Sequence, residues 1–356
     1  MECENKMEMT FRWYGQDDPV TLENIRQIPG MKGIVSAIYD IPVGEVWPRE
    51  RIKQLKEAIE SKGLKLSVIE SVPVHEDIKL GKPSRDTLIA NYCETIRNLG
   101  AEGIDTICYN FMPVFDWTRT DLAYPLPDGS NCLSFDEEVA KKMDPVLGEL
   151  SLPGWDSSYT KAEMKAVIDE YGKIDKEQLW SNLAYFIEKI IPVAEASGVK
   201  MAIHPDDPPY DIFGLPRIIT GQPAVERFLD LYDSEANGVT LCVGSYASDP
   251  ANDAVSILRY ALERNRVNFM HARNIKLTGE GKSFHESAHP SEYGSIDMFE
   301  VVKALHDYNW SGSIRPDHGR MIWGETGRAG YGLYDRALGA TYLHGLWEAI
   351  DKTSNR

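Results

Sequence analysis

The chain repeats one local pattern, in which a helical segment ends at a glycine and a short run of apolar, often β-branched residues follows. The pattern occurs as KEAIESKGLKLSVIES, TIRNLGAEGIDTICYNF and PVAEASGVKMAIHP. Gly63, Gly103 and Gly198 stand where a turn from helix to strand favours a positive φ, which glycine adopts without steric cost. Short apolar runs are typical of parallel strands covered by helices, so the pattern predicts repeated βαβ units.

Extending this pattern along the whole chain predicts eight strands, at residues 10–14, 33–39, 65–69, 104–110, 199–204, 238–243, 267–271 and 312–316. Helical segments separate them, and the clearest covers about residues 176–196, where apolar residues recur with a period of 3.6. Pro192 should kink or restart this helix. Eight alternating strands and helices favour an α/β fold of the (β/α)8 TIM-barrel type, and no GxGxxG follows the first strand to indicate dinucleotide binding. We expect residues 1–356 to form a single barrel domain.

The chain is longer than a plain barrel needs. A barrel of this type takes about 250 residues, so about a hundred of the 356 residues remain for insertions. They gather at about 111–160, 272–295 and 318–331, after the fourth, seventh and eighth strands. All three would emerge at the C-terminal rim, where this fold builds its active sites. Their Trp, Tyr, Pro and Arg content indicates a lid or pocket wall, with surface elaboration or a dimer contact as the alternative.

Composition narrows the classes of function. The chain is 42% apolar and 26% charged, as expected for a packed globular protein. Its 38 basic and 55 acidic residues give a net charge of −17, which disfavours binding to nucleic acid or to an anionic membrane. The sequence has neither an apolar stretch of membrane-spanning length nor a secretory signal pattern. Five irregularly spaced cysteines favour free thiols and a cytoplasmic location over a disulfide framework.

Residues of metal-ligand type stand at the ends of four successive predicted strands. They are His204 in MAIHPDD, Cys242 in TLCVGS, His271 in FMHARN and Asp317 in IRPDHG. Strand ends of a closed barrel surround one mouth, so these four side chains can converge on one ion. Two imidazoles, a thiolate and a carboxylate suit divalent Mn, Fe, Co or Zn better than Mg or Ca. Such an ion can chelate a hydroxy-carboxylate and acidify the carbon beside the carboxyl group.

Two further residues are placed for proton transfer. His318 directly follows Asp317, and Tyr331 lies between Gly330 and Gly332 in GRAGYGLYDR. A histidine beside a metal ligand can act as acid or base, and a tyrosine in a glycine-hinged loop can close over substrate. The structural alternatives are a hydrogen bond that supports the metal ligands for His318 and simple packing for Tyr331.

Polar and aromatic residues at other predicted strand ends could orient a polyhydroxylated acid. They are Arg12, Trp13, His75, Asn110 and Arg315. Arg315 is the best candidate for a bidentate contact with a carboxylate, although an arginine near a barrel end can equally pair with a structural acid.

Several long strings in the sequence resemble one family. FRWYG, VPVGEVWP, IESVPVHEDIKLG, YNFMPVFDWTRTDL, LPGWDSSY, MAIHPDDPPY, IFGLPRIITG, CVGSYASDP, RPDHGRMIWGE and GYGLYDRALGATY together resemble mannonate dehydratase. The resemblance runs from about residue 9 to 348. The stretch 281–293, GKSFHESAHPSEY, matches no string of the family firmly, so no role is assigned there.

The resemblance implies dehydration of D-mannonate to 2-dehydro-3-deoxy-D-gluconate in hexuronate (glucuronate) catabolism, on a barrel related to that of xylose isomerase. It implies Mn²⁺ as cofactor, with Fe²⁺ or Co²⁺ as alternatives, and a homodimer. His204, Cys242, His271 and Asp317 look like the family's metal ligands. His318 and Tyr331 look like its acid/base residues, and the sequence does not say which is the acid.

Two other functions fit the same residues. An aldose or sugar-phosphate isomerase of this architecture would share the metal mouth but would shift hydrogen between C1 and C2 without losing water. A sugar-acid binding or sensing protein would keep the pocket without turnover, and the presence of both His318 and Tyr331 argues against it.

Overall fold

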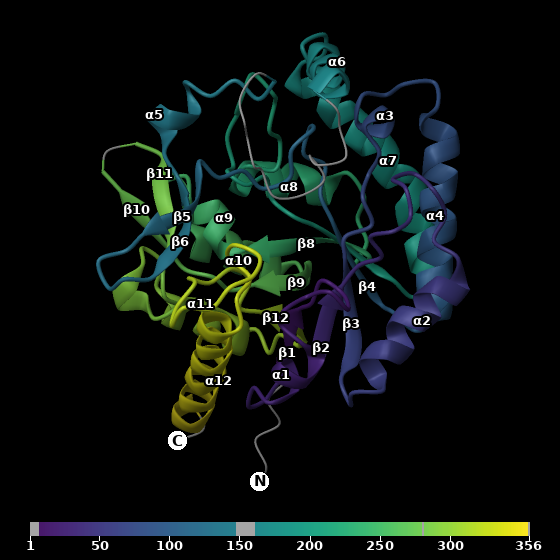
Figure 1. Ribbon diagram of the computed structural model, residues 1–356. Coiled ribbons are helices and arrows are strands. Elements are labelled where there is room, and N and C mark those ends of the chain that lie inside the picture. Colours follow the sequence, from purple (N-terminus) through teal and green to yellow (C-terminus); the bar gives the residue numbers. More distant parts are fainter. Residues whose placement is uncertain (1–6, 147–160, 280, 355–356) are drawn as a thin grey trace.

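Parallel strands close into a barrel in the computed structural model of the chain, which describes residues 7–146, 161–279 and 281–354 (Figure 1). The strand order around the barrel is β1-β12-β9-β8-β7-β4-β3-β2, and β2 closes it onto β1. These strands are β1 (Met7–Arg12), β2 (Gly33–Ser36), β3 (Lys65–Glu70), β4 (Thr106–Tyr109), β7 (Lys200–Ile203), β8 (Asn237–Cys242), β9 (Val267–His271) and β12 (Gly312–Arg315). Each overlaps one of the eight predicted strands, although the bounds differ by up to three residues at either end, and the barrel prediction is confirmed.

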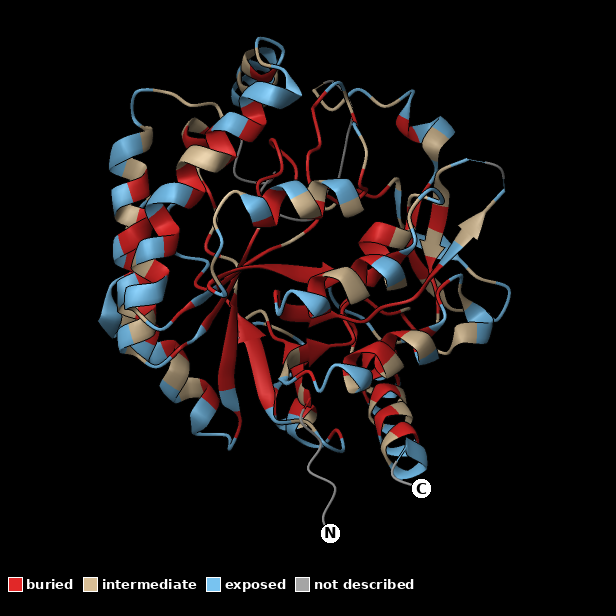
Figure 2. Ribbon diagram, turned by 180° about the vertical axis from the view of Figure 1, so that it is seen from behind, coloured by how far each residue is buried: buried red, intermediate tan, exposed pale blue. Residues whose placement is uncertain are grey.

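Helices surround the barrel and shield its buried strands, which Figure 2 shows in red. The helices are α1 (Leu22–Arg26), α2 (Arg49–Glu60), α3 (Glu76–Lys79), α4 (Arg85–Ala101), α5 (Glu137–Ala140), α6 (Lys161–Tyr171), α7 (Lys176–Ala196), α8 (Gln222–Asp230), α9 (Val243–Ala247), α10 (Ala254–Glu263), α11 (Met298–Asp307) and α12 (Tyr334–Ser354), with a 3₁₀ turn at Ser291–Tyr293. None of the described helices has the length and apolar character needed to cross a membrane.

Helix α7 buries the apolar stripe that the sequence predicted for it. Asp175 caps its N-terminus by accepting a hydrogen bond from the backbone N–H of Gln178 at 2.8 Å. The predicted apolar stripe is fully buried, and α7 lies beside α4. Pro192 does not divide the helix, which continues to Ala196. The turn that follows uses Gly198 at φ +66° to lead into β7, as expected.

The rim insertions fold into a second sheet that the sequence pattern did not predict. Strands β10 (Ile275–Thr278), β11 (Ser283–Glu286), β6 (Asn131–Phe135) and β5 (Asp121–Pro125) form an antiparallel sheet in that order. Two insertions far apart in the sequence supply two strands each, and Figure 1 shows them together to the left of the barrel. Asn131 also forms backbone hydrogen bonds with Met321, which ties the third insertion to this sheet. Residues 147–160, which belong to the first insertion and include LPGWDSSY, lie outside the described residues.

Candidate active site

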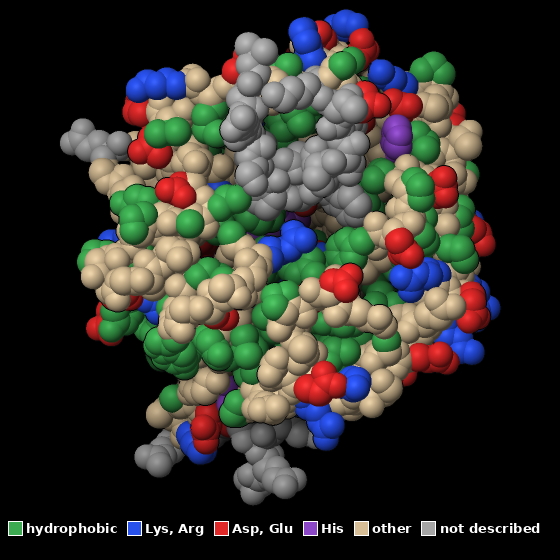
Figure 3. Space-filling model, viewed as in Figure 1, with side chains coloured by type: hydrophobic (Ala, Val, Ile, Leu, Met, Phe, Trp, Pro, Cys, Tyr) green, Lys and Arg blue, Asp and Glu red, His purple; other side chains and the backbone are tan. Residues whose placement is uncertain are grey.

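The carboxyl ends of the barrel strands open into a cavity of about 430 Å³. Strand-end residues and residues from the rim segments 111–160 and 318–331 form its wall. The described lining residues are Arg12, Tyr14, Tyr39, Glu70, Ser71, Cys108, Tyr109, Asn110, Asp116, Trp117, His204, Asp207, Arg315, Asp317, His318, Arg328 and Tyr331. Hydrophobic side chains gather near the centre of the face seen in Figure 3, and most charged ones lie toward its edge.

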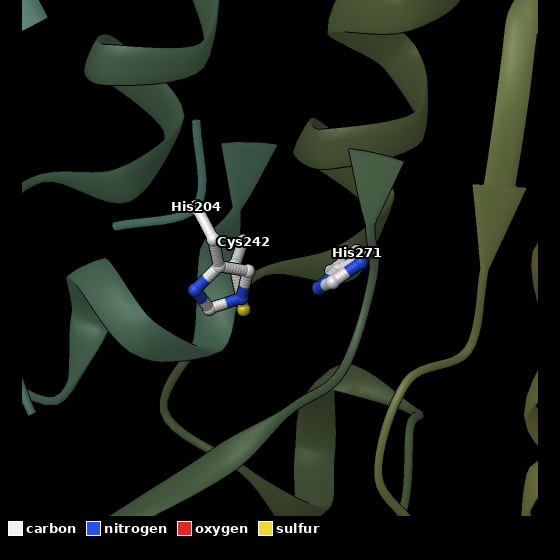
Figure 4. A group of neighbouring side chains, drawn as sticks. All are labelled: His204, Cys242 and His271. Atoms are coloured by element: carbon white, nitrogen blue, oxygen red, sulfur yellow. The ribbon is translucent and has the colours of Figure 1, made fainter. Parts of the chain in front are cut away.

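Three of the candidate metal ligands lie close together, and one of them, His204, lines this cavity. His204 follows β7, whereas Cys242 and His271 end the paired strands β8 and β9, in which they are register partners. One ligand atom from each of the three residues lies within 4.8 Å of the other two (Figure 4). Cys242 and His271 are fully buried, and the Nδ1 atom of His271 has no hydrogen-bond partner among the described residues. A buried, unsatisfied ring nitrogen beside a thiol and a second imidazole fits a divalent transition-metal ion.

Asp317, the fourth candidate, borders this group. Its Oδ2 atom lies 3.5 Å from Cys242 Sγ and 3.7 Å from His271 Nδ1. Burial alone would raise the pKa of Asp317, but Arg315 and other nearby positive groups hold it well below its usual range. Arg273 Nε and Arg315 Nη2 each lie 2.8 Å from its carboxylate. Asp317 is therefore an ionised oxygen donor that contacts two of the three grouped residues.

His318 and Tyr331 form a hydrogen-bonded pair in the cavity wall. His318 Nε2 and the Tyr331 hydroxyl lie 2.9 Å apart, and both residues are at most 5% exposed. Burial raises the pKa of the Tyr331 phenol well above its ordinary value. The preceding Gly330 has φ +77°, and a Cβ there would lie 2.5 Å from Leu133 Cδ1, so both conformation and space require glycine. The pair can pass a proton along its hydrogen bond.

Comparisons with known proteins show the family of the chain. Residues 7–356 match the family model described as D-mannonate dehydratase (UxuA). The chain belongs to the D-mannonate dehydratase family. It is 77% identical over 348 residues to the mannonate dehydratase of Streptococcus uberis, covering 98% of this chain and 100% of that one. The mannonate dehydratase of Streptococcus agalactiae serotype III is 76% identical with the same coverage.

Comparison with solved structures identifies the type of barrel. The crystal structure of mannonate dehydratase from Streptococcus suis serotype 2 matches with a TM-score of 0.92 and 60% identity, over 98% of this chain and 96% of that one. A xylose isomerase domain protein from Planctomyces limnophilus matches with a TM-score of 0.57 at 12% identity, over 97% and 99% of the chains, which shows the fold alone. The predicted xylose-isomerase-like barrel and the predicted family are both confirmed. Family membership makes this chain a metal-dependent hydro-lyase that acts on a sugar acid.

Three of the five residues expected to bind substrate line the cavity, and two do not. Arg12, Asn110 and Arg315 line the cavity. Trp13 is buried and does not belong to the described lining. His75 caps α3 by accepting a hydrogen bond from the backbone N–H of Asp77 and faces a different, small cavity. The geometry therefore does not support substrate contacts for Trp13 or His75.

Arg315 is less available to a substrate than the sequence indicated. Its Nη2 atom lies 2.8 Å from carboxylate oxygens of both Glu70 and Asp317, and its Nε lies 3.0 Å from His271 Nε2. The side chain is 3% exposed. The structure thus pairs Arg315 with two acids of the site itself, and of its guanidinium nitrogens only Nη1 has no hydrogen-bond partner among the described residues. A single free nitrogen does not supply the bidentate substrate contact expected from the sequence.

Several residues of the site escaped sequence reasoning. Glu70 is the last residue of β3, so the rule that selected Cys242 would also have selected it. Asp116 and Trp117 stand in a loop, where the sequence gave no register, yet they line the cavity. Glu286, which lies 3.1 Å from His318 Nδ1, belongs to the stretch 281–293 that matched no family string. The position of Glu286 beside His318 depends on the fold of the antiparallel sheet, which the sequence pattern did not predict.

Proposed function

We propose that this chain dehydrates D-mannonate to 2-dehydro-3-deoxy-D-gluconate and water, as a step of hexuronate (glucuronate) catabolism. The observation that carries the proposal is a group of metal-ligand side chains and a proton-transfer pair at one cavity. His318 and Tyr331 line this cavity together with His204 and Asp317, and Cys242 and His271 are grouped with His204. Metal-assisted elimination of water requires these two kinds of group at one substrate.

His204, Cys242, His271 and Asp317 would hold the ion, and their mixed nitrogen, sulfur and oxygen donors suit a divalent Mn, Fe, Co or Zn ion. On the family resemblance we propose Mn²⁺ as the cofactor, with Fe²⁺ or Co²⁺ as alternatives. A divalent ion bound there supplies Lewis acidity, which makes the C–H bond beside the substrate carboxylate easier to ionise. Asp317, ionised and paired with arginines, contributes negative charge that would hold a cation in place.

In the proposed proton transfers, His318 Nε2 takes the proton from C2 while the Tyr331 hydroxyl gives its proton to the departing C3 hydroxyl, which leaves as water. The raised pKa of Tyr331 supports the acid role, because the buried phenol stays protonated until a leaving group accepts its proton. The proton on His318 then returns to the Tyr331 oxygen along the 2.9 Å hydrogen bond. The enol product tautomerises to the ketone, and the pair is restored.

The domain organisation, the oligomeric state and the location of the protein are also proposals. We propose a single domain over residues 1–356, because Arg119, just before β5, pairs with Asp207, just after β7, at 2.9 Å and thus joins the inserted sheet to the barrel. A homodimer is supported by exposed aromatic residues near the third insertion, Trp323 at 74% and Tyr334 at 41% exposure, whose rings contact each other at a tilt. Four described cysteines are buried free thiols, which supports a cytoplasmic location.

The test is the mass of the product formed from D-mannonate by Mn²⁺-loaded protein, with an EDTA-treated sample alongside. We expect the loss of one water, which chelation abolishes and added Mn²⁺ restores. An unchanged mass with conversion to a carbonyl isomer would replace the proposal by an isomerase. No conversion of D-mannonate under either condition would contradict the proposed substrate.

A further inference from the structure

We propose that Glu286, on the inserted sheet, is a positioning residue that holds His318 in the orientation and tautomer that proton transfer requires. The inference rests on the proposed function in one respect, the role of His318 as the base. It assigns a task to the inserted antiparallel sheet, which a plain barrel lacks.

The Glu286 carboxylate makes its hydrogen bonds through one oxygen, Oε1, which also faces the imidazole, and its Oε2 has no partner among the described residues. Glu286 is fully buried, and its Oε1 lies 3.1 Å from His318 Nδ1. The same oxygen accepts hydrogen bonds from Arg273 Nη1 at 2.6 Å and Arg119 Nη2 at 3.0 Å. Both arginines also pair with Asp207, so the cluster is held from two sides. A carboxylate held in this way has little freedom to turn away from the ring.

This arrangement decides which nitrogen of His318 carries the proton. Two guanidinium groups keep Glu286 ionised, and an ionised carboxylate only accepts hydrogen bonds. His318 must therefore donate from Nδ1–H, so in the neutral ring it is Nε2, 2.9 Å from the Tyr331 hydroxyl, that keeps its lone pair. Without an acceptor at Nδ1 the ring could protonate Nε2 instead and could not take a proton there.

The inserted sheet sets the position of Glu286. Glu286 ends β11 and is the register partner of Ile275 on β10, while β11 also pairs with β6 from the first insertion. The pairing of two insertions therefore places one carboxylate against a residue that follows β12. A loop could not hold it as firmly, because the strand hydrogen bonds fix the backbone on both sides.

Glu286 could instead serve only as a counter-ion for the buried arginines. A purely structural role predicts lower stability, whereas the positioning role predicts a change at His318 itself. Glu76 provides a matched comparison, since it is a buried glutamate, 9% exposed, whose carboxylate lies 2.6 Å from Lys79 Nζ. Glu76 does not belong to the described lining of the cavity, and the same change to Leu can be made there.

The experiment compares Glu286→Leu, Glu286→Gln and Glu76→Leu in Mn²⁺-loaded protein. Leucine removes the acceptor at Nδ1, whereas the amide oxygen of glutamine can still accept a hydrogen bond there. General acid–base catalysis contributes about 100-fold or more, so we expect Glu286→Leu to lower kcat for D-mannonate by about that factor and Glu286→Gln to recover part of kcat. Metal content and KM should stay within about threefold of the parent, and Glu76→Leu should keep the parent kcat. Equal kcat in Glu286→Leu and the parent, or an equal loss in Glu76→Leu, would overturn the positioning role.

A second measurement needs no variant at Glu286. In Zn²⁺-loaded protein labelled with ¹⁵N-histidine, the His318 signals can be assigned by their loss in His318→Asn. We expect the parent to show the tautomer protonated at Nδ1, and a parent protonated at Nε2 would overturn the proposal. Full turnover in His318→Asn would refute the proposed catalytic role instead, and the tautomer would still decide whether Glu286 holds the ring.

Discussion

Replacing Cys242 by serine should weaken metal binding, and an internal control makes the effect measurable. Cys242 Sγ is the only sulfur in the described ligand group and accepts a hydrogen bond from Ser245 Oγ at 3.0 Å. Cys108 is buried to a similar degree and accepts one from Thr240 Oγ1 at 3.2 Å. It is not a member of the ligand group. Cys108→Ser therefore repeats the chemical change in a similar buried setting without removing a ligand.

The expected magnitude follows from binding linkage. Loss of a group that only supports a ligand already costs 10- to 100-fold in metal affinity, so loss of the ligand itself should cost about 100-fold or more. At a Mn²⁺ concentration about 1,000 times the parent Kd, the ion stabilises the parent by about 4 kcal/mol and Cys242→Ser by about 1.4 kcal/mol. The unfolding entropy of 356 residues is about 0.75 kcal/mol per kelvin. The Mn²⁺-induced rise in Tm should thus be about 5 °C in the parent and about 2 °C in the variant.

The assay is thermal unfolding of each protein with EDTA and with Mn²⁺. The difference between the two melts isolates metal binding, because any intrinsic effect of serine on stability is present in both. Cys108→Ser should show the parent rise even if its Tm is lower throughout. A parent-sized rise in Cys242→Ser would refute the thiolate as a ligand, and an equal loss in both variants would show that the cavity as a whole had changed.

Three further predictions test the proton-transfer pair, the substrate contact and the buried cluster. His318→Asn should retain bound Mn²⁺ by elemental analysis but lose about 100-fold or more of kcat; unchanged turnover would remove His318 from the mechanism. Arg328 lines the cavity over the Tyr14 ring and forms no ion pair with a described residue. Arg328→Gln should therefore raise KM for D-mannonate about tenfold with a smaller change in kcat, and an unchanged KM would exclude this contact. Burial alone would raise the pKa of Glu286, but Arg273, His318 and Arg119 lower it from 4.5 to about 2. Its contribution to the free energy of unfolding is thus complete above pH 4.5 and is lost as the pH falls toward 2, so urea midpoints of Glu286→Gln should fall less steeply over that range.

The barrel could be predicted because its signals are local. Gly63, Gly103 and Gly198 all adopt positive φ, and each precedes a strand whose apolar residues are buried. The closure of a barrel then brings strand ends together whatever their separation in sequence, which is why His204, Cys242 and His271 could be grouped before their distances were seen.

The inserted sheet could not be predicted in the same way. β5 and β6 are separated from β10 and β11 in the chain by three of the eight barrel strands, and their pairing depends on tertiary contacts rather than on a turn. β5 is largely exposed, so its residues carry no apolar period. The sequence therefore did not predict the role of Glu286, because its position depends on this sheet. The ion-pair partners of Arg315 were also not predicted, because the end of a strand shows where a side chain lies but not which acids it pairs with.

The charges around the cavity explain how a protein with a net charge of −17 can receive an anionic substrate. The described lining holds three arginines and four carboxyl groups, so its own side chains are not cationic. Arg12 and Arg315 are already close to Glu70, and Arg315 also pairs with Asp317, so little of their charge is directed outward. The positive potential that an aldonate needs must therefore come mainly from a bound divalent ion and from Arg328. The ion would then be required twice, once to attract the substrate and once to activate its C2 proton.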